Sequence, residues 1–487
     1  MRRQRVKKKN NAPKSEKRKK TRKNHEMGMV TYLFTGLFAL LIGYLVYFDG
    51  VLREDVINNP YNSRQETFAE QVIRGKILSN DGTVLAETLV GEDGEEIRSY
   101  PFGDMFAHAV GYASHGRTGV EALGNFSLLT SNAFLPERIT KEIKEEKNLG
   151  DNLITTLDVD LQRAAYAALG SQRGAIVAIE PSTGKILCMV SKPDFDPNQI
   201  GEKWETWNGL DSADSVLYNR VTQGLYAPGS VFKVVTLLDD LRENPQAEDT
   251  TFHCSGSLTQ GNYTISCYRR SAHGTQSLQK AFAHSCNTAF AQIGLELDPT
   301  AFGQTCKSLL FGVDLPVDLP YSRSSFALTG QASEDEKMMT AIGQGQTMVS
   351  PMHMALITAS IANKGVLMEP YLIDHIESYT GDQVRAYRPK AYGSLMTDVE
   401  AGKLTEYMRQ VVESGTAKTL NNLPVTVAGK TGSAEYSSDK TKSHAWFIGF
   451  SMEEEKDLAV CVLVEGAGSG GEYAVPIARR LFEVYYS

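Results

Sequence analysis

The chain has 487 residues, which is too long for one ordinary hydrophobic core, so we expect two or more structural units. Its hydrophobic share of 41% and charged share of 22% are those of a globular protein, which excludes a chain that is disordered throughout. The net charge of -8 excludes a protein that is basic over its whole length, as many nucleic-acid-binding proteins are.

The N-terminal segment consists of a basic stretch followed by an apolar one. Residues 1–28 carry a charge of about +11 and almost nothing apolar, which predicts a tail that does not fold alone. Residues 29–48 form an uncharged run of the length that a helix needs to cross a bilayer. We interpret this run as an uncleaved single-pass anchor, because it continues with DGVLREDV rather than with a small-residue cleavage site.

The charge asymmetry around this anchor predicts an orientation in the cell membrane. Basic residues stay on the cytoplasmic side, so the N-terminus is expected in the cytoplasm and everything after Asp49 outside. The part outside would carry a charge of about -19, which leaves no surface suited to a nucleic-acid partner.

Residues 49–150 are predicted to form a small N-terminal α+β unit. They contain short strand-like pieces with glycine turns, and Asn80, Asp81 and Gly82 are typical of a hairpin. No catalytic residue types cluster here, so we expect a pedestal or dimerisation role. A highly charged stretch ends the unit near residue 150.

Residues 151–487 are predicted to be the catalytic domain. A helix at 161–169 leads into two apolar strands about a Pro-Ser-Thr-Gly turn, and helices follow between about residues 230 and 362. Three strands and a last helix complete the chain. Two early and three late strands indicate one mixed sheet flanked by helices, with an all-helical lobe inserted in it and a site in the crevice between them.

The six cysteines do not form a recognisable metal or redox motif. No Cys-x-x-Cys pair occurs, and the spacing of Cys254 and Cys267 with His253 and His273 fits no ligand pattern, so we predict no metal site. Cys254 and Cys267 flank a turn-rich stretch in an exported region, and the sequence leaves a disulfide and two free thiols equally open.

Ser-x-x-Lys occurs at four places, so the pattern alone selects no nucleophile. Three of the matches lie in unfavourable places. Ser182/Lys185 is in a hairpin turn, Ser277/Lys280 comes just before another motif, and Ser437/Lys440 is in a polar loop. Ser230 differs, because it follows Pro228 and Gly229 and opens an apolar helix that carries Lys233.

This placement of Ser230 and Lys233 has chemical consequences. Residues three apart in a first helical turn share one face, and the helix N-terminus favours negative charge that develops there. Serine is a poor nucleophile until a base takes its proton. Since no His or Asp stands at a triad spacing, Lys233 is the candidate base. Burial, or a second cation such as Lys430, would favour the neutral amine that this role requires.

Two further motifs each occur once, Ser285-Cys286-Asn287 and Lys430-Thr431-Gly432. The order Ser-x-x-Lys, Ser-x-Asn, Lys-Thr-Gly is the signature of penicillin-recognising enzymes. The segments YAPGSVFKVVT, AHSCNTAF and VAGKTGSAEYSS, followed by HAWFIGF, resemble class B penicillin-binding proteins. The short chain with its small N-terminal unit resembles the penicillin-binding protein A branch, and the resemblance runs from about Arg74 to the C-terminus.

The resemblance implies a fold and an activity. The fold would be the α+β penicillin-binding/serine β-lactamase-like transpeptidase domain, preceded by the small unit and one transmembrane helix. The activity would be peptidoglycan D,D-transpeptidation without a cofactor, on stem peptides that end in D-Ala-D-Ala, with covalent inhibition by β-lactams. The chain has no glycosyltransferase module, so the resemblance also implies a separate glycan polymerase of the SEDS type as partner.

The resemblance also assigns roles to residues. It implies Ser230 as the acylated nucleophile, Lys233 as its base, Ser285 as proton relay to the leaving amine and Asn287 as the residue that holds the substrate amide.

In the third motif, the resemblance implies that Lys430 and Thr431 bind the terminal carboxylate and that Gly432 lets the substrate backbone approach. The backbone N–H groups of Ser230 and Ser433 would form the oxyanion hole. Cys286, in the middle of the second motif, and Ser433, where threonine is commoner, are departures that both keep a small side chain.

Two alternative functions remain open from the sequence. The same residues would serve a hydrolase, either a D,D-carboxypeptidase or a β-lactamase, although no extra carboxylate for deacylation can be placed in the site. A non-catalytic β-lactam sensor or scaffold is the other alternative, and a cytoplasmic tail of about 28 residues is short for a signalling domain.

Overall fold

The computed structural model describes residues 14–48, 71–144, 146–209, 215–436 and 442–487. The chain consists of two compact units, residues 1–62 and 63–487. The first half of the predicted basic tail and the linker after the apolar run lie outside the described residues.

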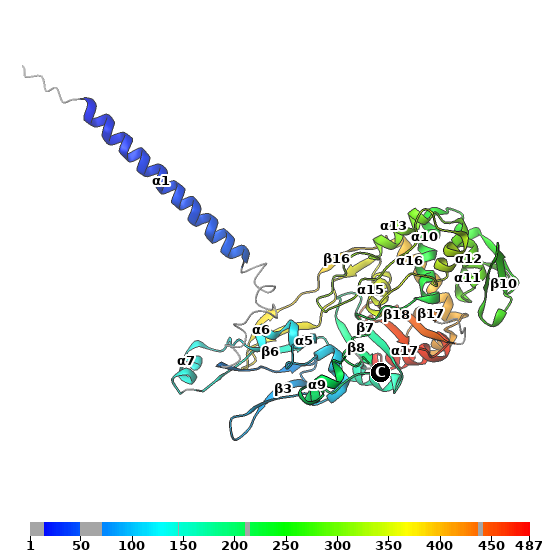
Figure 1. Ribbon diagram of the computed structural model, residues 1–487, viewed down its shortest axis with the longest axis horizontal. Coiled ribbons are helices and arrows are strands. Elements are labelled where there is room, and N and C mark those ends of the chain that lie inside the picture. Colours follow the sequence, from blue (N-terminus) through cyan, green and yellow to red (C-terminus); the bar gives the residue numbers. More distant parts are fainter. Residues whose placement is uncertain (1–13, 49–70, 145, 210–214, 437–441) are drawn as a thin grey trace, which may run out of the picture. The chain divides into compact units, whose positions relative to one another are not determined.

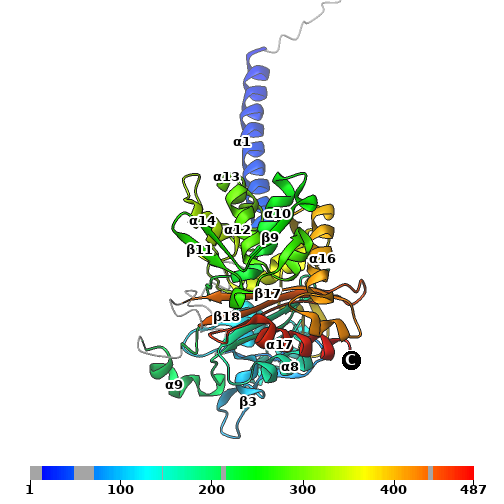
Figure 2. The ribbon, with the colours of Figure 1, turned by 90° about the vertical axis from the view of Figure 1, so that its right-hand side faces the viewer.

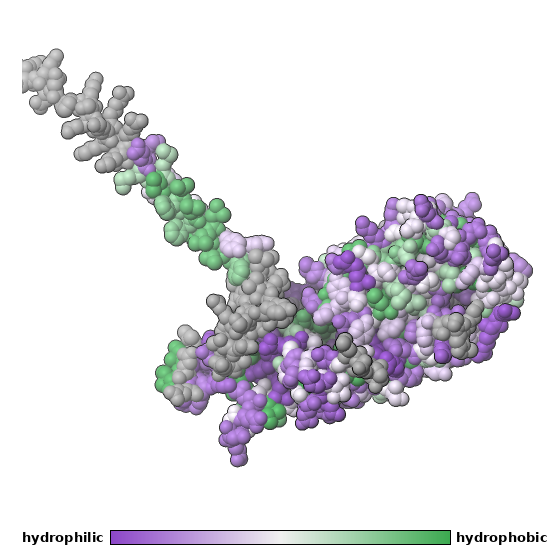
Figure 3. Space-filling model, in the orientation of Figure 1, coloured by the Kyte–Doolittle hydropathy of each residue, from purple (hydrophilic) through white to green (hydrophobic). Residues whose placement is uncertain are grey.

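The described part of the first unit is one helix, α1 (Lys14–Tyr47) (Figure 1). Among the described residues, His25–Tyr47 is the one helical segment long and apolar enough to cross a membrane, with a mean hydropathy of 2.0. Figure 3 shows apolar residues along this part of the helix. The helix begins before the predicted apolar run, because Lys, Arg and Glu are good helix formers and continue the same backbone geometry.

A six-stranded sheet begins the second unit. Its strands, in spatial order, are β15 (Gln383–Ala386), β14 (Ile373–Glu377), β6 (Asn152–Thr155), β2 (Ile77–Leu78), β3 (Val84–Val90) and β4 (Glu96–Ser99). The predicted hairpin is confirmed between β2 and β3, where Gly82 has a φ of +83° that suits glycine. The sheet is mixed, because β2 and β6 run parallel.

This sheet crosses the predicted domain boundary at residue 150. β6 follows the boundary directly, and β14 and β15 come from far along the predicted catalytic domain. Around the sheet lie α4 (Ala107–Val110), α5 (Gly119–Leu123), α6 (Asn125–Leu128), α7 (Leu135–Ile143) and the parallel pair β1 (Val72–Ile73) and β5 (Asn148–Leu149). The boundaries 49–150 and 151–487 stay a prediction.

A second, five-stranded sheet carries the candidate site. Its order is β17 (Val427–Glu435), β18 (Ser443–Ser451), β19 (Ala459–Val464), β7 (Gly174–Ile179) and β8 (Ile186–Lys192), so the late strands pair with the early ones as predicted. Every pairing in this sheet is antiparallel, whereas the sequence predicted that these five strands form a mixed sheet. The sheet that mixes parallel and antiparallel pairs is the six-stranded one.

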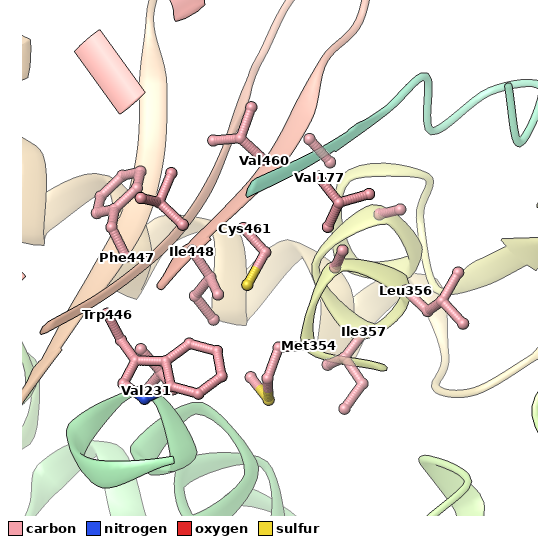
Figure 4. Close-up of a cluster of buried hydrophobic side chains, with 14 of the residues drawn as sticks. Val177, Val231, Met354, Leu356, Ile357, Trp446, Phe447, Ile448, Val460 and Cys461 are labelled. Carbon is pink, nitrogen blue, oxygen red and sulfur yellow. The ribbon is translucent and has the colours of Figure 1, made fainter. Parts of the chain in front are cut away.

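Helices cover both faces of the five-stranded sheet (Figures 1 and 2). α8 (Val159–Leu169) and α17 (Gly470–Tyr485) lie on one face, and α15 (Pro351–Ala362) lies on the other. Figure 4 shows Ile448 and Cys461 of the sheet pointing towards Met354 on α15. All three side chains are fully buried, and burial of a side chain such as Ile448 or Met354 stabilises the fold by about 1.5 to 3 kcal/mol.

The lobe beyond α15 is mainly helical (Figure 2). It contains α10 (Lys233–Glu243), α11 (Leu278–Ala283), α12 (Asn287–Glu296), α13 (Pro299–Ser308), α14 (Glu334–Ala341) and, beside the sheet, α16 (Asp398–Glu413). The prediction of an all-helical lobe misses two antiparallel pairs, β9 (Thr251–Cys254) with β12 (Gly274–Ser277) and β10 (Ser257–Gln260) with β11 (Tyr263–Ser266). Their alternating exposed and buried residues and the Gly261 turn favour strands over helix.

The remaining described α-helix is α9 (Ile200–Trp207), and the remaining strands are the antiparallel pair β13 (Val366–Met368) and β16 (Ala391–Ser394). Short 3-10 helices lie between these elements.

Candidate active site

Ser230 lies in a short 3-10 helix, η4 (Gly229–Phe232), which continues directly into α10. The predicted helix start is therefore confirmed, with a tighter first turn. Gly229 N donates a hydrogen bond to Gly343 O at 2.8 Å, and a Cβ atom at Gly343 would overlap the Gly229 carbonyl. Gly343 also has a φ of +75°, so only glycine fits this close approach of two backbones.

Strand β17 lies against the η4 turn. A Cβ atom at Gly229 would come 2.7 Å from Ser433 O, and one at Gly432 would come 3.1 Å from Val231 N. The Ser433 carbonyl thus faces the turn that carries Ser230. In an antiparallel strand the N–H and C=O of one residue point to the same side, so the Ser433 N–H also faces the turn.

The free edge of β17 supports this orientation. In the amide orientation that satisfies both groups, Gln344 accepts a hydrogen bond from Glu435 N at 3.1 Å and donates to Glu435 O at 3.3 Å. The backbone of Glu435 therefore points away from β18, and residues two apart along a strand point to the same side. The free edge of the sheet thus offers the backbone groups of Ser433 beside Ser230.

Three predicted motifs meet at the Ser285 hydroxyl. Lys233 Nζ donates to Asn287 Oδ1 at 2.7 Å and to Ser285 O at 2.8 Å, and it lies 3.3 Å from Ser285 Oγ. Lys430 Nζ reaches the same Ser285 Oγ at 2.9 Å. Ser285 has a φ of +55°, an uncommon conformation for serine that turns the chain between α11 and α12.

Both lysines of this cluster are fully buried. Burial lowers the pKa of Lys233 to about 8, although the neighbouring Cys286 and Cys267 thiols oppose this shift. Burial, and then the charge of Lys233, lower the pKa of Lys430 well below its usual value. The rings of Phe290 and Phe282 lie 5.4 and 5.5 Å from the two amines and help to exclude water.

The remaining predicted residues line the same region. Thr431 Oγ1 and Thr416 Oγ1 are 2.5 Å apart, and Ser433 Oγ accepts a hydrogen bond from Gly470 N at 3.3 Å. In the part of the chain that the structure describes, the Ser230 hydroxyl is not in the hydrogen-bonded cluster around Ser285. Ser230 is placed instead by the backbone packing of η4 against Gly343 and β17.

The rival Ser-x-x-Lys matches have structural roles where they are described. Ser182 donates to Asp457 at 2.9 Å in the turn between β7 and β8. Ser277 caps the N-terminus of α11 by accepting a hydrogen bond from Lys280 N at 3.4 Å. Ser437 and Lys440 lie outside the described residues.

The sequence interpretation missed two residues of this region. Gly343 holds the η4 turn, and the glycines of AIGQGQ signal a tight backbone there without saying which segment it meets. Thr416, three residues after the end of α16, contacts Thr431, and no pattern in the sequence signals that contact.

The chain was compared with known proteins. Residues 174–483 match the model of the penicillin binding protein transpeptidase domain, and residues 74–153 match that of the penicillin binding protein A dimerisation domain. The chain therefore belongs to the penicillin-binding protein transpeptidase family, which confirms the resemblance found in the sequence.

Within that family, individual proteins are similar over most of their length. The peptidoglycan D,D-transpeptidase PbpA of Mycolicibacterium smegmatis is 33% identical over 435 residues, which cover 83% of this chain and 87% of that protein. Penicillin-binding protein A from M. tuberculosis, in an acyl-enzyme complex with ceftriaxone, has a TM-score of 0.78 at 27% identity and covers 87% of this chain and 100% of its own. The D,D-transpeptidase domain of a peptidoglycan glycosyltransferase from Eggerthella lenta has a TM-score of 0.76 at 29% identity, with coverages of 85% and 98%.

Proposed function

We propose that this chain is a serine D-Ala-D-Ala transpeptidase that cross-links peptidoglycan stem peptides through an acyl-enzyme on Ser230. The observation that carries the proposal is the convergence of Lys233 and Lys430 on the Ser285 hydroxyl beside the η4 turn. The family and the activity named for the PbpA relative support it.

In the first step, Ser230 Oγ attacks the carbonyl carbon of the penultimate D-Ala. Neutral Lys233 takes the hydroxyl proton, and the N–H groups of Ser230 and Ser433 stabilise the oxyanion. Collapse of the tetrahedral intermediate breaks the peptide bond and forms the ester on Ser230. The terminal D-Ala leaves after its amine nitrogen receives a proton through Ser285.

The lysine pair explains how a neutral base is available. Two ammonium groups that point at one hydroxyl repel each other, so charge on one disfavours charge on the other. The terminal carboxylate of the substrate, bound by Lys430 and Thr431, favours the charged form of Lys430. Lys233 is then left neutral when the substrate is in place.

Asn287 and Gly432 have positioning roles in this proposal. The Asn287 carboxamide, held by Lys233 and by a donation to Ser266 O at 2.9 Å, holds the substrate amide. Gly432 has no side chain, so the substrate backbone can approach strand β17.

In the second step, an amine of a neighbouring stem peptide attacks the ester, forms the new peptide bond and releases Ser230. A β-lactam would acylate the same serine and stay bound. The ring nitrogen that leaves the carbonyl stays covalently attached to the acyl group, so it does not depart and free the site for an acceptor. The similar penicillin-binding protein A from M. tuberculosis forms such an acyl-enzyme with ceftriaxone.

The nucleophile is tested by labelling the purified chain with fluorescent penicillin. We expect Ser230→Ala to abolish covalent labelling and Ser182→Ala, the matched Ser-x-x-Lys control in a surface turn, to leave it unchanged. Undiminished labelling of the Ser230→Ala protein would show that the assignment is wrong.

Hydrolysis is distinguished by the lifetime of the penicilloyl-enzyme. A lifetime of hours supports a transpeptidase, because its site lacks an efficient base for water. A lifetime of seconds would instead indicate a β-lactamase. Rescue of a deletion strain by Ser230→Ala as fully as by the wild type would indicate a scaffold.

The cellular setting belongs to the same proposal. The N-terminus lies in the cytoplasm, α1 crosses the cell membrane once, and residues 49–487 act outside it, next to a membrane-embedded SEDS-type glycan polymerase. The positive-inside rule and the apolar segment His25–Tyr47 support this orientation. We expect a reporter enzyme that works only outside the cytoplasm to be active when it is fused after Ser487. An inactive reporter would indicate the opposite orientation in the membrane.

A further inference from the structure

Four side chains with metal-binding atoms converge in the lobe. Cys254 ends β9, Cys267 follows β11, His273 precedes β12, and Cys286 is the N-cap residue of α12. Their ligand atoms all lie within 4.8 Å of one another. The three cysteines are buried and the histidine is half-buried.

The sequence expectation of no metal site considered the wrong set of residues. His253 lies next to Cys254 on β9, so its side chain points to the other face, where its ring contacts Thr275 at 3.3 Å. The fourth ligand comes instead from Cys286, nineteen positions after Cys267 and inside the second catalytic motif.

Three of the ligand–ligand separations match those of a tetrahedral site. Sulfur ligands at about 2.3 Å from a zinc ion lie about 3.8 Å from one another, and a sulfur and a nitrogen ligand lie about 3.5 Å apart. The observed separations are 3.7 Å from Cys254 Sγ to Cys267 Sγ, 3.8 Å from Cys267 Sγ to Cys286 Sγ and 3.4 Å from Cys254 Sγ to His273 Nδ1.

A disulfide explains this cluster less well. A disulfide requires sulfurs about 2.05 Å apart, and all six cysteines of the chain are free. Any one disulfide here would also leave the third thiol and the imidazole without a role. Thr288 Oγ1 lies 3.2 Å from Cys286 Sγ, where a hydroxyl can donate to a metal-bound thiolate.

We propose that Cys254, Cys267, Cys286 and His273 bind one zinc ion. Three thiolates and one imidazole are a soft, four-ligand set that suits Zn²⁺ and leaves no position open for substrate. The ion is therefore structural and takes no part in the acyl transfer. This proposal is independent of the proposed transpeptidase activity, because the metal content of the chain can be measured without an activity assay.

The ion would position the second catalytic motif. Cys286 stands between Ser285 and Asn287, both of which contact Lys233. Asn287 Nδ2 also donates to Ser266 O, the residue before Cys267. A zinc ion would thus tie the motif to the β9–β12 and β10–β11 pairs and hold Ser285 in its uncommon backbone conformation.

The test measures metal in the full-length chain, purified in detergent without chelator. We expect about one zinc ion per chain. Cys254→Ser and Cys267→Ser should lower this to less than about a tenth of an ion. Cys306→Ser, a matched buried cysteine in α13 outside the cluster, should keep the ion.

The wild-type chain gives a second readout that does not depend on how the variants fold. After removal of zinc by a chelator, Co²⁺ should produce the visible absorption of tetrahedral cobalt and a sulfur-to-cobalt charge-transfer band. A wild-type chain that binds neither metal, or an intact Cys254–Cys267 disulfide in mass spectrometry, would overturn the proposal.

The positioning role is tested on the same samples. Zinc removal should slow penicillin labelling by about ten-fold or more, since small displacements of a catalytic group cost about that much, and zinc readdition should restore the rate. An unchanged rate in the zinc-free chain would overturn this role. Ser230→Ala is expected to lose labelling and keep its zinc, which separates failure of the metal site from failure of the proposed transpeptidase function.

Discussion

At the scale of single residues, two buried lysines carry the proposed chemistry. Lys233 and Lys430 are fully buried, and both reach Ser285 Oγ. Removing an ammonium group from water disfavours its charged form, so burial makes an amine that is a usable base near neutral pH. An amine in a solvated turn would instead stay protonated near neutral pH.

The pH dependence of acylation follows from the lowered pKa of Lys233. Protonated Lys233 has no lone pair, so the acylation rate should rise with pH and level off above a pKa of about 8. Below about pH 7 the rate should fall about ten-fold per pH unit. Stopped-flow measurement of the second-order rate constant for β-lactam acylation tests this, and a flat profile between about pH 6 and 9 would contradict it.

Substitution of the base provides a sharper test. A guanidinium stays protonated in proteins, so Lys233→Arg keeps the charge and removes the base. We expect acylation to slow by about 10² to 10⁴-fold. Lys185→Arg, at the surface Ser-x-x-Lys match, is the control and should acylate at the wild-type rate. Near-normal acylation of the Lys233→Arg protein would show that a residue other than Lys233 is the base.

At the scale of elements, the site depends on how η4 is held. The turn is pressed between Gly343 and the edge of β17, with glycines at the two closest approaches. Since helix termini fray when nothing packs against them, this support holds the N–H groups of the first turn in place for the proposed oxyanion hole.

Gly343→Ala tests that support. The new Cβ would overlap the Gly229 carbonyl and strain a backbone with positive φ, so we expect a lower melting temperature and acylation slowed by about ten-fold or more. Gly402→Ala in α16 is the matched control, because nothing lies within 4 Å of its Cβ position. It should stabilise the chain by about 0.5 to 1 kcal/mol in thermal unfolding and leave acylation unchanged.

The elements also show where pattern reading succeeds. The β7–β8 hairpin, the β2–β3 hairpin and the helix after Ser230 are set by residues that are neighbours in sequence, and all three were predicted. The β9–β12 and β10–β11 pairs were not, because their strands are only four residues long and mostly polar.

At the scale of the whole molecule, the larger of the two hydrophobic clusters among the described residues spans both sheets of the second unit. It includes Ile77 and Leu153 of the six-stranded sheet and Val462 of the five-stranded sheet. β14 and β15, which follow α15 in sequence, complete the first sheet. The N-terminal part and the catalytic part therefore share strands rather than only a linker.

A buried ion pair in the N-terminal part tests how far this coupling extends. Glu121 is fully buried between Arg74 and Arg98, at 2.5 and 2.8 Å. Glu121→Gln would leave two largely buried guanidinium groups without their carboxylate partner, so we expect a loss of about 3 to 5 kcal/mol in denaturant unfolding.

The same variant should acylate normally when folded, because Glu121 contacts no residue of the candidate site. Glu87→Gln, which breaks a surface pair with Lys76, is the control and should cost less than about 1 kcal/mol. A Glu121→Gln protein as stable as the control would show that the buried pair adds nothing to the fold.

The sequence by itself determined the parts of this protein that depend on local chain order. These parts are the apolar anchor, the hairpins and the three motifs. They could be predicted because their spacing and their uniqueness are visible in the amino-acid sequence alone. The family, and with it the expected roles of Ser230, Lys430 and their companions, followed from the order of those motifs.

Only the tertiary structure decided how distant segments meet. Three contacts join residues that are far apart in sequence. Gly343 packs against Gly229, β14 and β15 pair into the N-terminal sheet, and Cys286 lies beside Cys254, Cys267 and His273. Such contacts arise from packing of the whole core, and no local spacing encodes them. For the same reason a cysteine that looked like a neutral substitution inside a catalytic motif became the fourth ligand of a proposed metal site.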